Sequence, residues 1–398
     1  MSNLSQKPLP AHLPALDGLR GVAILLVLAH MFTLLDPQQG VLAYIYYKVN
    51  YLGWIGVQLF FVLSGFLITG ILLDSRTATH YYRSFFARRT LRIFPLYFAV
   101  LAVAFLLVPA VGAVPASIAN DQPNQAWLWT YTENWASSLG LGSKTFPHFW
   151  SLAVEEQFYL VWPFVIRRQT PEKCLRLCLA LAAISLGVRC WLVWNGATHE
   201  AIYPNSFCRM DALALGGAAA AAFRIPALRV VLIDHRERLL RYALMLTLVG
   251  VAVTRGFWHM TVIGQTVGYS ILAVIFVLLL MSAVAGEAAP AEPSQPSHMS
   301  AWLAVMRWAP LRTIGKYSYG MYVFHKPLHD FLGKPLLAAL DIHASQSLLA
   351  DVLYIVLATL ATLALAAVSY HLFEQRFLGM KRFFQSQPGE TNAAGTRR

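Results

Sequence analysis

The sequence predicts an all-α, polytopic membrane protein with about ten transmembrane helices. Of its 398 residues, 57% are hydrophobic and only 13% are charged, and the mean hydropathy is +0.53. A soluble domain carries roughly 25% charged residues. Several stretches without Asp, Glu, Lys or Arg are also long enough to cross a hydrocarbon layer of about 30 Å as helices. These observations indicate a membrane protein rather than a soluble globular domain.

The predicted helices follow one another along the chain. The first covers residues 16–35, LDGLRGVAILLVLAHMFTLL. The long segments without charged residues are 49–73, 93–120, 260–286 and 352–373. Shorter or more polar candidates are 149–166, 175–194, 211–223, 239–254 and 315–333. The last of these is the least certain span by hydropathy, because it contains His325, Lys326 and Asp330.

The remaining segments are ends and connections. Residues 1–15 are polar and contain Pro, without the basic-then-apolar layout of a cleavable signal peptide, and we expect a cytoplasmic segment. The membrane domain is predicted over residues 16–384. Residues 286–300 include a stretch rich in Pro, Ser and Ala, which is typical of a flexible linker. The polar residues 385–398 predict a disordered cytoplasmic tail.

The formal net charge of +12 arises mainly from Arg and Lys in alternate connections between the apolar segments. Residues 114–148, by contrast, are nearly free of cations. The positive-inside rule places the basic connections in the cytoplasm, and an even number of helices then places both termini there. This topology explains the charge without a nucleic-acid partner, while some cations can contact lipid headgroups. The four cysteines show no CxxC spacing, and we expect no metal site.

Arg20 and His30 share the first apolar segment. Ionisable residues inside a membrane helix are costly, which makes them candidates for a functional site. At helical rise the two residues lie roughly 15 Å apart. We therefore expect Arg20 near the cytoplasmic surface and His30 about halfway across the membrane.

His325 is predicted at a similar depth, and Glu155 lies roughly 8–10 Å from the outer side. A histidine beside a carboxylate suits general base catalysis. Two alternatives stay open: these groups satisfy one another inside the bundle, or the two histidines bind a haem or metal between helices.

Residues 77–92, TATHYYRSFFARRTLR, predict a basic and aromatic loop. Its arginines suit a bidentate grip on phosphates, but the loop by itself favours the alternative of a positive-inside loop that contacts anionic lipids. In FFVLSGFLITGILL, Gly65 and Gly70 indicate close helix packing, and Ser64 gives only weak evidence of a nucleophile. The aromatic residues of 44–54 and 127–135 suit an interfacial belt or stacking on sugar rings.

Five motifs in order resemble the acyltransferase-3 family of bacterial integral membrane O-acyltransferases. They are LDGLRGVAILLVLAH, FFVLSGFLITGIL, FFARRTLRIFPLYF, HFWSLAVEEQFYLVWP and GKYSYGMYVFHKPL, and the resemblance extends from residue 16 to about residue 374. It implies ten helices in the bacterial inner membrane, with both termini inside. It also implies transfer of an acyl group, usually acetyl, from cytoplasmic acyl-CoA to a hydroxyl. Family acceptors are mostly glycans or glycolipids, such as lipopolysaccharide O-antigen, capsule or peptidoglycan, and sometimes macrolides.

The resemblance also implies site residues. The family's Arg and His on the first helix fall on Arg20 and His30, and its Arg-x-x-Arg motif falls on Arg89 and Arg92. Its Ser-Leu-x-x-Glu-x-x-Phe-Tyr motif falls on Ser151, Leu152, Glu155, Phe158 and Tyr159. We expect His30, Glu155, Arg20 and His325 to be catalytic, and Arg88, Arg89 and Arg92 to bind the phosphates of acyl-CoA. His30 acts as general base or accepts the acyl group transiently, Glu155 orients a histidine or contacts the acceptor, and His325 is a second possible base.

The chain departs from the family pattern at two places. Nine residues separate Arg20 from His30, where ten are common, and residues 374–376 read Glu-Gln-Arg without the family's Pro. The chain also ends before the C-terminal esterase-like domain of many relatives, so that the membrane domain or a separate partner would complete the transfer. The sequence leaves the oligomeric state open. The alternative function is a transporter or flippase of a polar lipid-linked substrate, which uses the buried polar residues as a path without acyl transfer.

Overall fold

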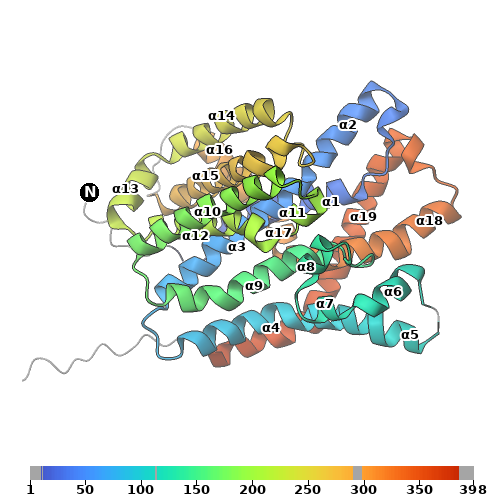
Figure 1. The fold of residues 1–398 in the computed structure, drawn as a ribbon, viewed down its shortest axis with the longest axis horizontal. Coiled ribbons are helices and arrows are strands. Elements are labelled where there is room, and N and C mark those ends of the chain that lie inside the picture. Colours follow the sequence, from blue (N-terminus) through green and yellow to red (C-terminus); the bar gives the residue numbers. More distant parts are fainter. Residues whose placement is uncertain (1–9, 11, 113, 290–297, 385–398) are drawn as a thin grey trace, which may run out of the picture.

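The computed structural model describes residues 10, 12–112, 114–289 and 298–384. Over these residues the chain forms helices and no strand, so the predicted all-α class is confirmed (Figure 1). The predicted tail, residues 385–398, and residues 290–297 of the predicted linker lie outside the described residues. On either side of the latter, α15 (Tyr269–Ala288) and α16 (His298–Met306) are helical.

Within the described part of the chain, six helical segments are long and apolar enough to cross a membrane. They are Pro14–Phe32 (α1), Val41–Asp74 (α2 to α3), Tyr81–Ala110 (α4 to α5), Pro171–Trp194 (α10), Gly264–Ala288 (η5 and α15) and Leu348–Phe384 (α19 to η9). A seventh span results if α12 (Ser206–Ala222) and α13 (Pro226–Asp234), which are bent by 99°, are one unit. The prediction of about ten spans is therefore not confirmed, and the cytoplasmic location of the termini stays a prediction.

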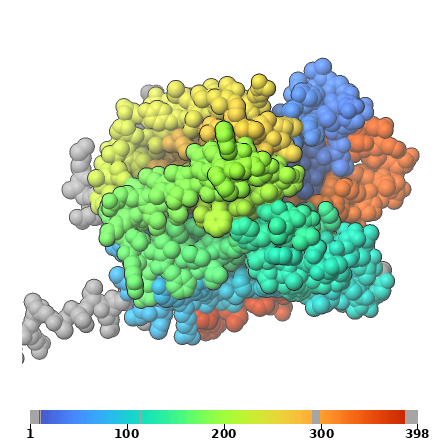
Figure 2. Space-filling model, viewed as in Figure 1, coloured from blue at the N-terminus to red at the C-terminus, as the bar shows by residue number. Residues whose placement is uncertain are grey.

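A helix nevertheless occupies each of the ten predicted segments. Those outside the six long apolar spans and the bent pair are α9 (Phe149–Ile166), α14 (Arg236–Thr254) and α17 (Ala309–Leu328). Shorter helices complete the fold: α2 (Val41–Tyr51), α6 (Ala116–Asp121), α7 (Ala126–Trp129), α8 (Glu133–Ser138), α11 (His199–Ile202), α18 (Lys334–Ala339) and α20 (Gln375–Gly379). Figure 2 shows α2, in blue, standing out at one end of the molecule, with the teal residues around α6 to α8 below it.

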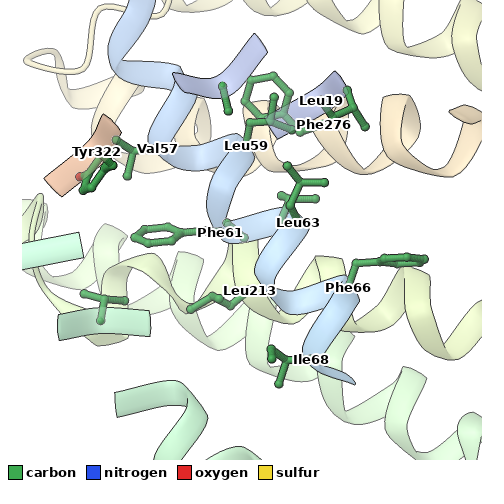
Figure 3. Close-up of a cluster of buried hydrophobic side chains, with 14 of the residues drawn as sticks. Leu19, Val57, Leu59, Phe61, Leu63, Phe66, Ile68, Leu213, Phe276 and Tyr322 are labelled. Atoms are coloured by element: carbon green, nitrogen blue, oxygen red, sulfur yellow. The ribbon is translucent and has the colours of Figure 1, made fainter. Parts of the chain in front are cut away.

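Helix α3 (Ile55–Asp74) passes through the centre of the bundle and packs against α12, α1, α15 and α9. Figure 3 shows its apolar side chains, such as Phe61 and Leu63, beside Leu213 of α12 and Phe276 of α15. A Cβ atom on Gly65 would collide with the carbonyl oxygen of Leu213. The predicted packing role of Gly65 is confirmed, because only a glycine lets the two backbones approach so closely.

Helix α1 is held on its other side by α17, which in turn packs against α19 (Leu348–Ser369). At this crossing Gly315 of α17 lies against the backbone of Asp17, where a Cβ atom would collide with the carbonyl oxygen. The close contact fixes α17 one helix diameter from α1. It thereby places the polar residues of α17 beside Arg20.

The segment predicted as a basic loop, residues 77–92, is mostly helical. Helix α4 (Tyr81–Ala102) begins at Tyr81 and includes Arg83, Arg88, Arg89 and Arg92. The aromatic residues of its first turns pack rather than face water: the ring of Tyr82 stacks on Phe164 of α9 with centroids 4.9 Å apart. Because Arg89 and Arg92 are three residues apart on a helix, their side chains share one face.

Candidate active site among helices α1, α3, α4, α9 and α17

Three cavities meet at Arg20 and Arg92, which line all of them. The first, which we call the central cavity, has an empty volume of about 700 Å³ and lies among α1, α3, α4, α9 and α17. The two wider cavities, of about 1440 and 1540 Å³, are lined by the first turns of α1. They are therefore at the end of the bundle that the charge pattern predicts to be cytoplasmic.

The central cavity combines cations with hydroxyl and carboxyl groups. Arg20, Arg89 and Arg92 contribute guanidinium groups from two helices. The remaining lining is apolar or carries oxygen: Val57, Phe60, Phe61, Leu63, Ser64, Ile93, Ser151, Leu152, Glu155, Ser318, Tyr319 and Tyr322. Guanidinium groups bind phosphate in bidentate fashion. The cavity can therefore hold an anionic group at the arginines and an uncharged group among the apolar residues.

Ser64 and Glu155 form a short contact inside the central cavity. The Ser64 hydroxyl donates a hydrogen bond to Oε1 of Glu155 at 2.5 Å. It also accepts one from the Tyr159 hydroxyl at 2.8 Å. The guanidinium carbon of Arg89 lies 3.7 Å from the centroid of the Tyr159 ring, a cation–π distance, and Nε of Arg89 lies 3.8 Å from Oε1 of Glu156.

The structure brings four of the predicted site residues together: Arg20, Arg89, Arg92 and Glu155 all line the central cavity. Arg88 is separate from them. Its side chain is exposed on α4 and lines none of the three cavities. The 100° turn per residue rotates it away from Arg89.

His30 lies elsewhere, in the last turn of α1, which ends at Phe32 before the chain becomes extended from Thr33. Its depth halfway across the membrane, counted from Arg20 at helical rise, stays a prediction. The imidazole of His30 contacts Tyr51 edge-on, with centroids 5.4 Å apart. His30 does not line the three cavities described above.

Around His30 an aromatic and histidine-rich cluster forms. The Tyr51 hydroxyl lies 2.6 Å from Nε2 of His259, and Nδ1 of His259 lies 2.7 Å from Nε2 of His199. Trp258 stacks on Tyr51 with centroids 4.1 Å apart. Burial lowers the pKa of His259, which lies in the connection after α14, to about 3, so its imidazole is neutral at physiological pH. The cluster presents rings and neutral hydrogen-bonding groups, which suit contact with a sugar.

His325 belongs to a different cluster. It is buried in α17, its Nδ1 lies 2.7 Å from the Tyr322 carbonyl oxygen, and its ring packs on His148 with centroids 4.5 Å apart. Phe32 packs against it, with centroids 6.4 Å apart. Because His30 and Phe32 are two residues apart, they point to nearly opposite sides of α1. The expected meeting of His30, His325 and Glu155 is therefore not what the structure has, and a haem held between the two histidines does not fit it.

Sequence reasoning underrated Ser64 and missed His148 and His259. The resemblance did indicate the two hydrogen-bond partners of Ser64. Glu155 and Tyr159 belong to one motif and are four residues apart, on one face of α9. Nothing in the sequence pairs that face with Ser64. Among the described residues, no three His, Cys, Asp or Glu side chains are grouped so as to hold a metal ion.

The chain is similar to an acyltransferase domain and to named O-acetyltransferases. The family model of the acyltransferase domain, Acyl_transf_3, matches residues 13–371. The chain is 26% identical over 342 residues to the peptidoglycan O-acetyltransferase OatA of Listeria monocytogenes, a match that covers 80% of this chain and 49% of that protein. It is also 26% identical over 406 residues to the O-acetyltransferase OatA of Staphylococcus aureus, covering 94% of this chain and 59% of that protein. The chain thus matches about half of each relative's length, and no solved structure matches it.

Proposed function

The chain belongs to the acyltransferase family whose domain model it matches, and from this premise we propose that it transfers an acyl group, expected to be acetyl, from cytoplasmic acyl-CoA to a hydroxyl of a cell-surface or exported glycan. One observation carries the proposal: Arg20, Arg89 and Arg92 line the same cavity as the hydrogen-bonded pair of Ser64 and Glu155. The multi-pass protein would act in the bacterial inner membrane. The relatives' names favour peptidoglycan over lipopolysaccharide as the acceptor.

The donor side follows from charge and shape. The phosphates of acyl-CoA would bind Arg20 and Arg92, which also line the two wider cavities. Arg89 lies deeper, beside Tyr159, and Arg88 is at most at the rim. The pantetheine arm would pass the apolar residues, such as Phe60 and Leu63, and bring the thioester to Glu155. A carboxylate at this position can take a proton from an attacking hydroxyl.

The acceptor side is proposed at the opposite end of α1. His30 would contact the acceptor glycan, supported by Tyr51 and the neutral His259. His325, beside His148, is the second candidate for this role. The aromatic rings near His30 give the glycan a surface on which to stack.

The test is cleavage of acyl-CoA by the purified protein in liposomes. Acetyl-CoA carrying a radiolabelled acetyl group is added with soluble peptidoglycan fragments, and free CoA thiol and labelled glycan are measured. We expect both products to appear in equal amounts. Bound acetyl-CoA that is never cleaved, together with movement of a lipid-linked glycan across the bilayer, would contradict the proposal and favour the flippase alternative.

A further inference from the structure

We propose that Ser64 carries the acyl group as a covalent ester between its release from acyl-CoA and its transfer to the acceptor. The inference rests on the proposed function and adds a nucleophile to it. Ser64 lies in the middle of α3, where its neighbours Leu63 and Gly65 are buried, yet its own side chain is partly exposed. The exposed part faces the central cavity, which it lines together with the arginines.

The hydrogen bonds of Ser64 have the direction that a nucleophile needs. Tyr159 donates to the Ser64 oxygen, so the single proton of Ser64 is left to point at Glu155, 2.5 Å away. A serine is a weak nucleophile until an adjacent base takes this proton. Ser151 is another serine in the cavity, but its hydroxyl lies 2.6 Å from the Tyr322 hydroxyl rather than beside a carboxylate.

The charges around the pair favour the reaction. A thioester carbonyl develops negative charge on its oxygen when a nucleophile attacks. Arg89 lies against the face of the Tyr159 ring, whose hydroxyl donates to Ser64. The positive charge of Arg89 would stabilise the oxyanion, and the low polarity of Phe60 and Leu63 would strengthen the interaction.

Both half-reactions balance. In the first, Ser64 Oγ forms a bond to the acyl carbon, the carbon–sulfur bond of acyl-CoA breaks, and the Ser64 proton passes through Glu155 to the departing thiolate, which gives free CoA thiol. In the second, the acceptor oxygen forms a bond to the acyl carbon, the Ser64 ester bond breaks, and the acceptor's proton ends on Ser64 Oγ. No oxidant, reductant or metal is needed.

The distance between His30 and Ser64 separates the proposed acceptor contact from the donor site. A Cβ atom on Gly53 would touch the Cβ of His30, and eleven residues along the same span separate Gly53 from Ser64, which is roughly 16 Å at helical rise. His30 is therefore too far from Ser64 to take the acceptor's proton there. In this mechanism Glu155 is the base of both half-reactions, and His30 contacts the acceptor away from its reacting hydroxyl. An acyl-serine keeps the acyl group in the protein after CoA has left, so donor and acceptor need not be bound together.

The experiment traps the ester. The full chain in detergent is mixed with radiolabelled acetyl-CoA without acceptor, quenched in acid after short times, digested and analysed by mass spectrometry. We expect a burst of about one free thiol per protein and an acetyl group on the peptide that contains Ser64. Ser64→Ala should lose the burst and the label, with thiol release falling by about a thousandfold or more. Ser64→Cys should carry the acetyl group as a thioester, which neutral hydroxylamine cleaves. The ester on Ser64 of the unaltered protein should resist the same treatment.

The controls separate this inference from the proposed function. Ser282→Ala removes a buried hydroxyl of α15 outside the site and should keep burst and label. Retained binding of acetyl-CoA by Ser64→Ala shows that this variant is folded. If Ser64→Ala acylates the glycan at the normal rate, or if the label lies on His30, the carrier inference is wrong and the acyltransferase function stands. If the unaltered protein releases no thiol without acceptor but does so when the glycan is added, only the carrier inference is wrong. If it releases no thiol even with the glycan while acetyl-CoA is bound, the proposed function fails as well.

Discussion

The hydroxyl of Ser64 lies 2.5 Å from Oε1 of Glu155, although 91 positions separate the two residues in the chain. The contact depends on the placement of α3, which reaches α9 on one side while Gly65 admits the backbone of α12 on the other. Packing at Gly65 thus fixes the rotation of α3 that turns Ser64 toward Glu155.

Glu155→Gln tests the base. The amide keeps the size of the side chain and can still accept the Ser64 hydrogen bond, but it cannot take the proton. We expect acetyl-CoA cleavage to fall by about 10²- to 10⁴-fold, the usual contribution of a general base, with acetyl-CoA binding preserved. The measurement is free thiol release beside equilibrium binding of labelled acetyl-CoA. Cleavage at the normal rate would show that Glu155 is not the base.

Arg20→Ala and Arg92→Ala test the phosphate site. A hydrogen bond to a charged group contributes about 1.5–3 kcal/mol, so each change should raise the KM for acetyl-CoA by about 10- to 100-fold. The increase should be smaller at high salt, because salt screens the attraction between arginine and phosphate. Arg83→Ala is the matched control, because Arg83 is exposed on the same helix and lies outside the three cavities.

Arg88→Ala tests whether Arg88 binds acyl-CoA, for which the sequence and the structure give different predictions. The sequence predicts that Arg88 binds acyl-CoA, whereas the structure leaves its side chain exposed and away from the cavities. From the structure we expect the KM for acetyl-CoA to change by less than about threefold, the scale of an exposed ion pair. An increase in KM as large as that of Arg92→Ala would show that Arg88 binds acyl-CoA, as the sequence predicts.

The sequence predicts the helical class and the grouping of Arg20 with Arg89 and Arg92. It places Glu155 nearer the outer side, at the level of the histidines, whereas in the structure Glu155 lines the same cavity as the arginines. The sequence does not predict the neighbours of His30. The count of residues from Arg20 gives its distance along the helix, but not which side chains meet it near the end of α1. Nor can the sequence reveal the partner of Ser64, since a contact between distant helices depends on their relative rotation, and hydropathy leaves that rotation undetermined.

His30→Ala tests the separation of the two half-reactions. Because His30 lies outside the central cavity, we expect glycan acylation to be lost while the burst of CoA thiol without acceptor persists and the protein level stays normal. The two readouts are labelled glycan and free thiol from the same sample. Full glycan acylation by His30→Ala would remove His30 from the mechanism, and loss of the thiol burst would contradict the separation.

Gly65→Ala tests the helix packing. A Cβ atom at this position collides with the Leu213 carbonyl oxygen, a backbone atom that cannot move aside alone. Overpacking of this kind costs about 1–3 kcal/mol, so the midpoint of thermal unfolding in detergent should fall. Gly187→Ala is the control, because a Cβ atom there meets nothing within 4 Å. Equal midpoints for the two variants would show that α3 and α12 can separate without cost.

Glu133 predicts a pH dependence of stability in the connection before α9. Its carboxylate is buried and accepts a hydrogen bond from the Ser143 amide at 2.6 Å, while burial raises its pKa from 4.5 to about 7. The folded state therefore holds a proton between these pH values that the unfolded chain has lost. It follows that the free energy of unfolding decreases as pH rises from about 4.5 to 7, and is constant beyond.

Glu133→Gln should remove that decrease, because the amide is neutral throughout and can accept the same hydrogen bonds. At pH 8 the variant should exceed the unaltered protein by about 1–3 kcal/mol, since each pKa unit corresponds to about 1.4 kcal/mol, whereas the two should be close at pH 4.5. Unfolding midpoints across this range measure the difference. Glu172→Gln, which changes an exposed carboxylate of α10, should leave the slope between pH 5 and 7 as it is. If the stability of Glu133→Gln falls with pH as steeply as that of the unaltered protein, the Glu133 carboxyl is not the cause of the pH dependence. The hydrogen bond from the Ser143 amide would then stabilise the fold equally with a neutral or a charged Glu133.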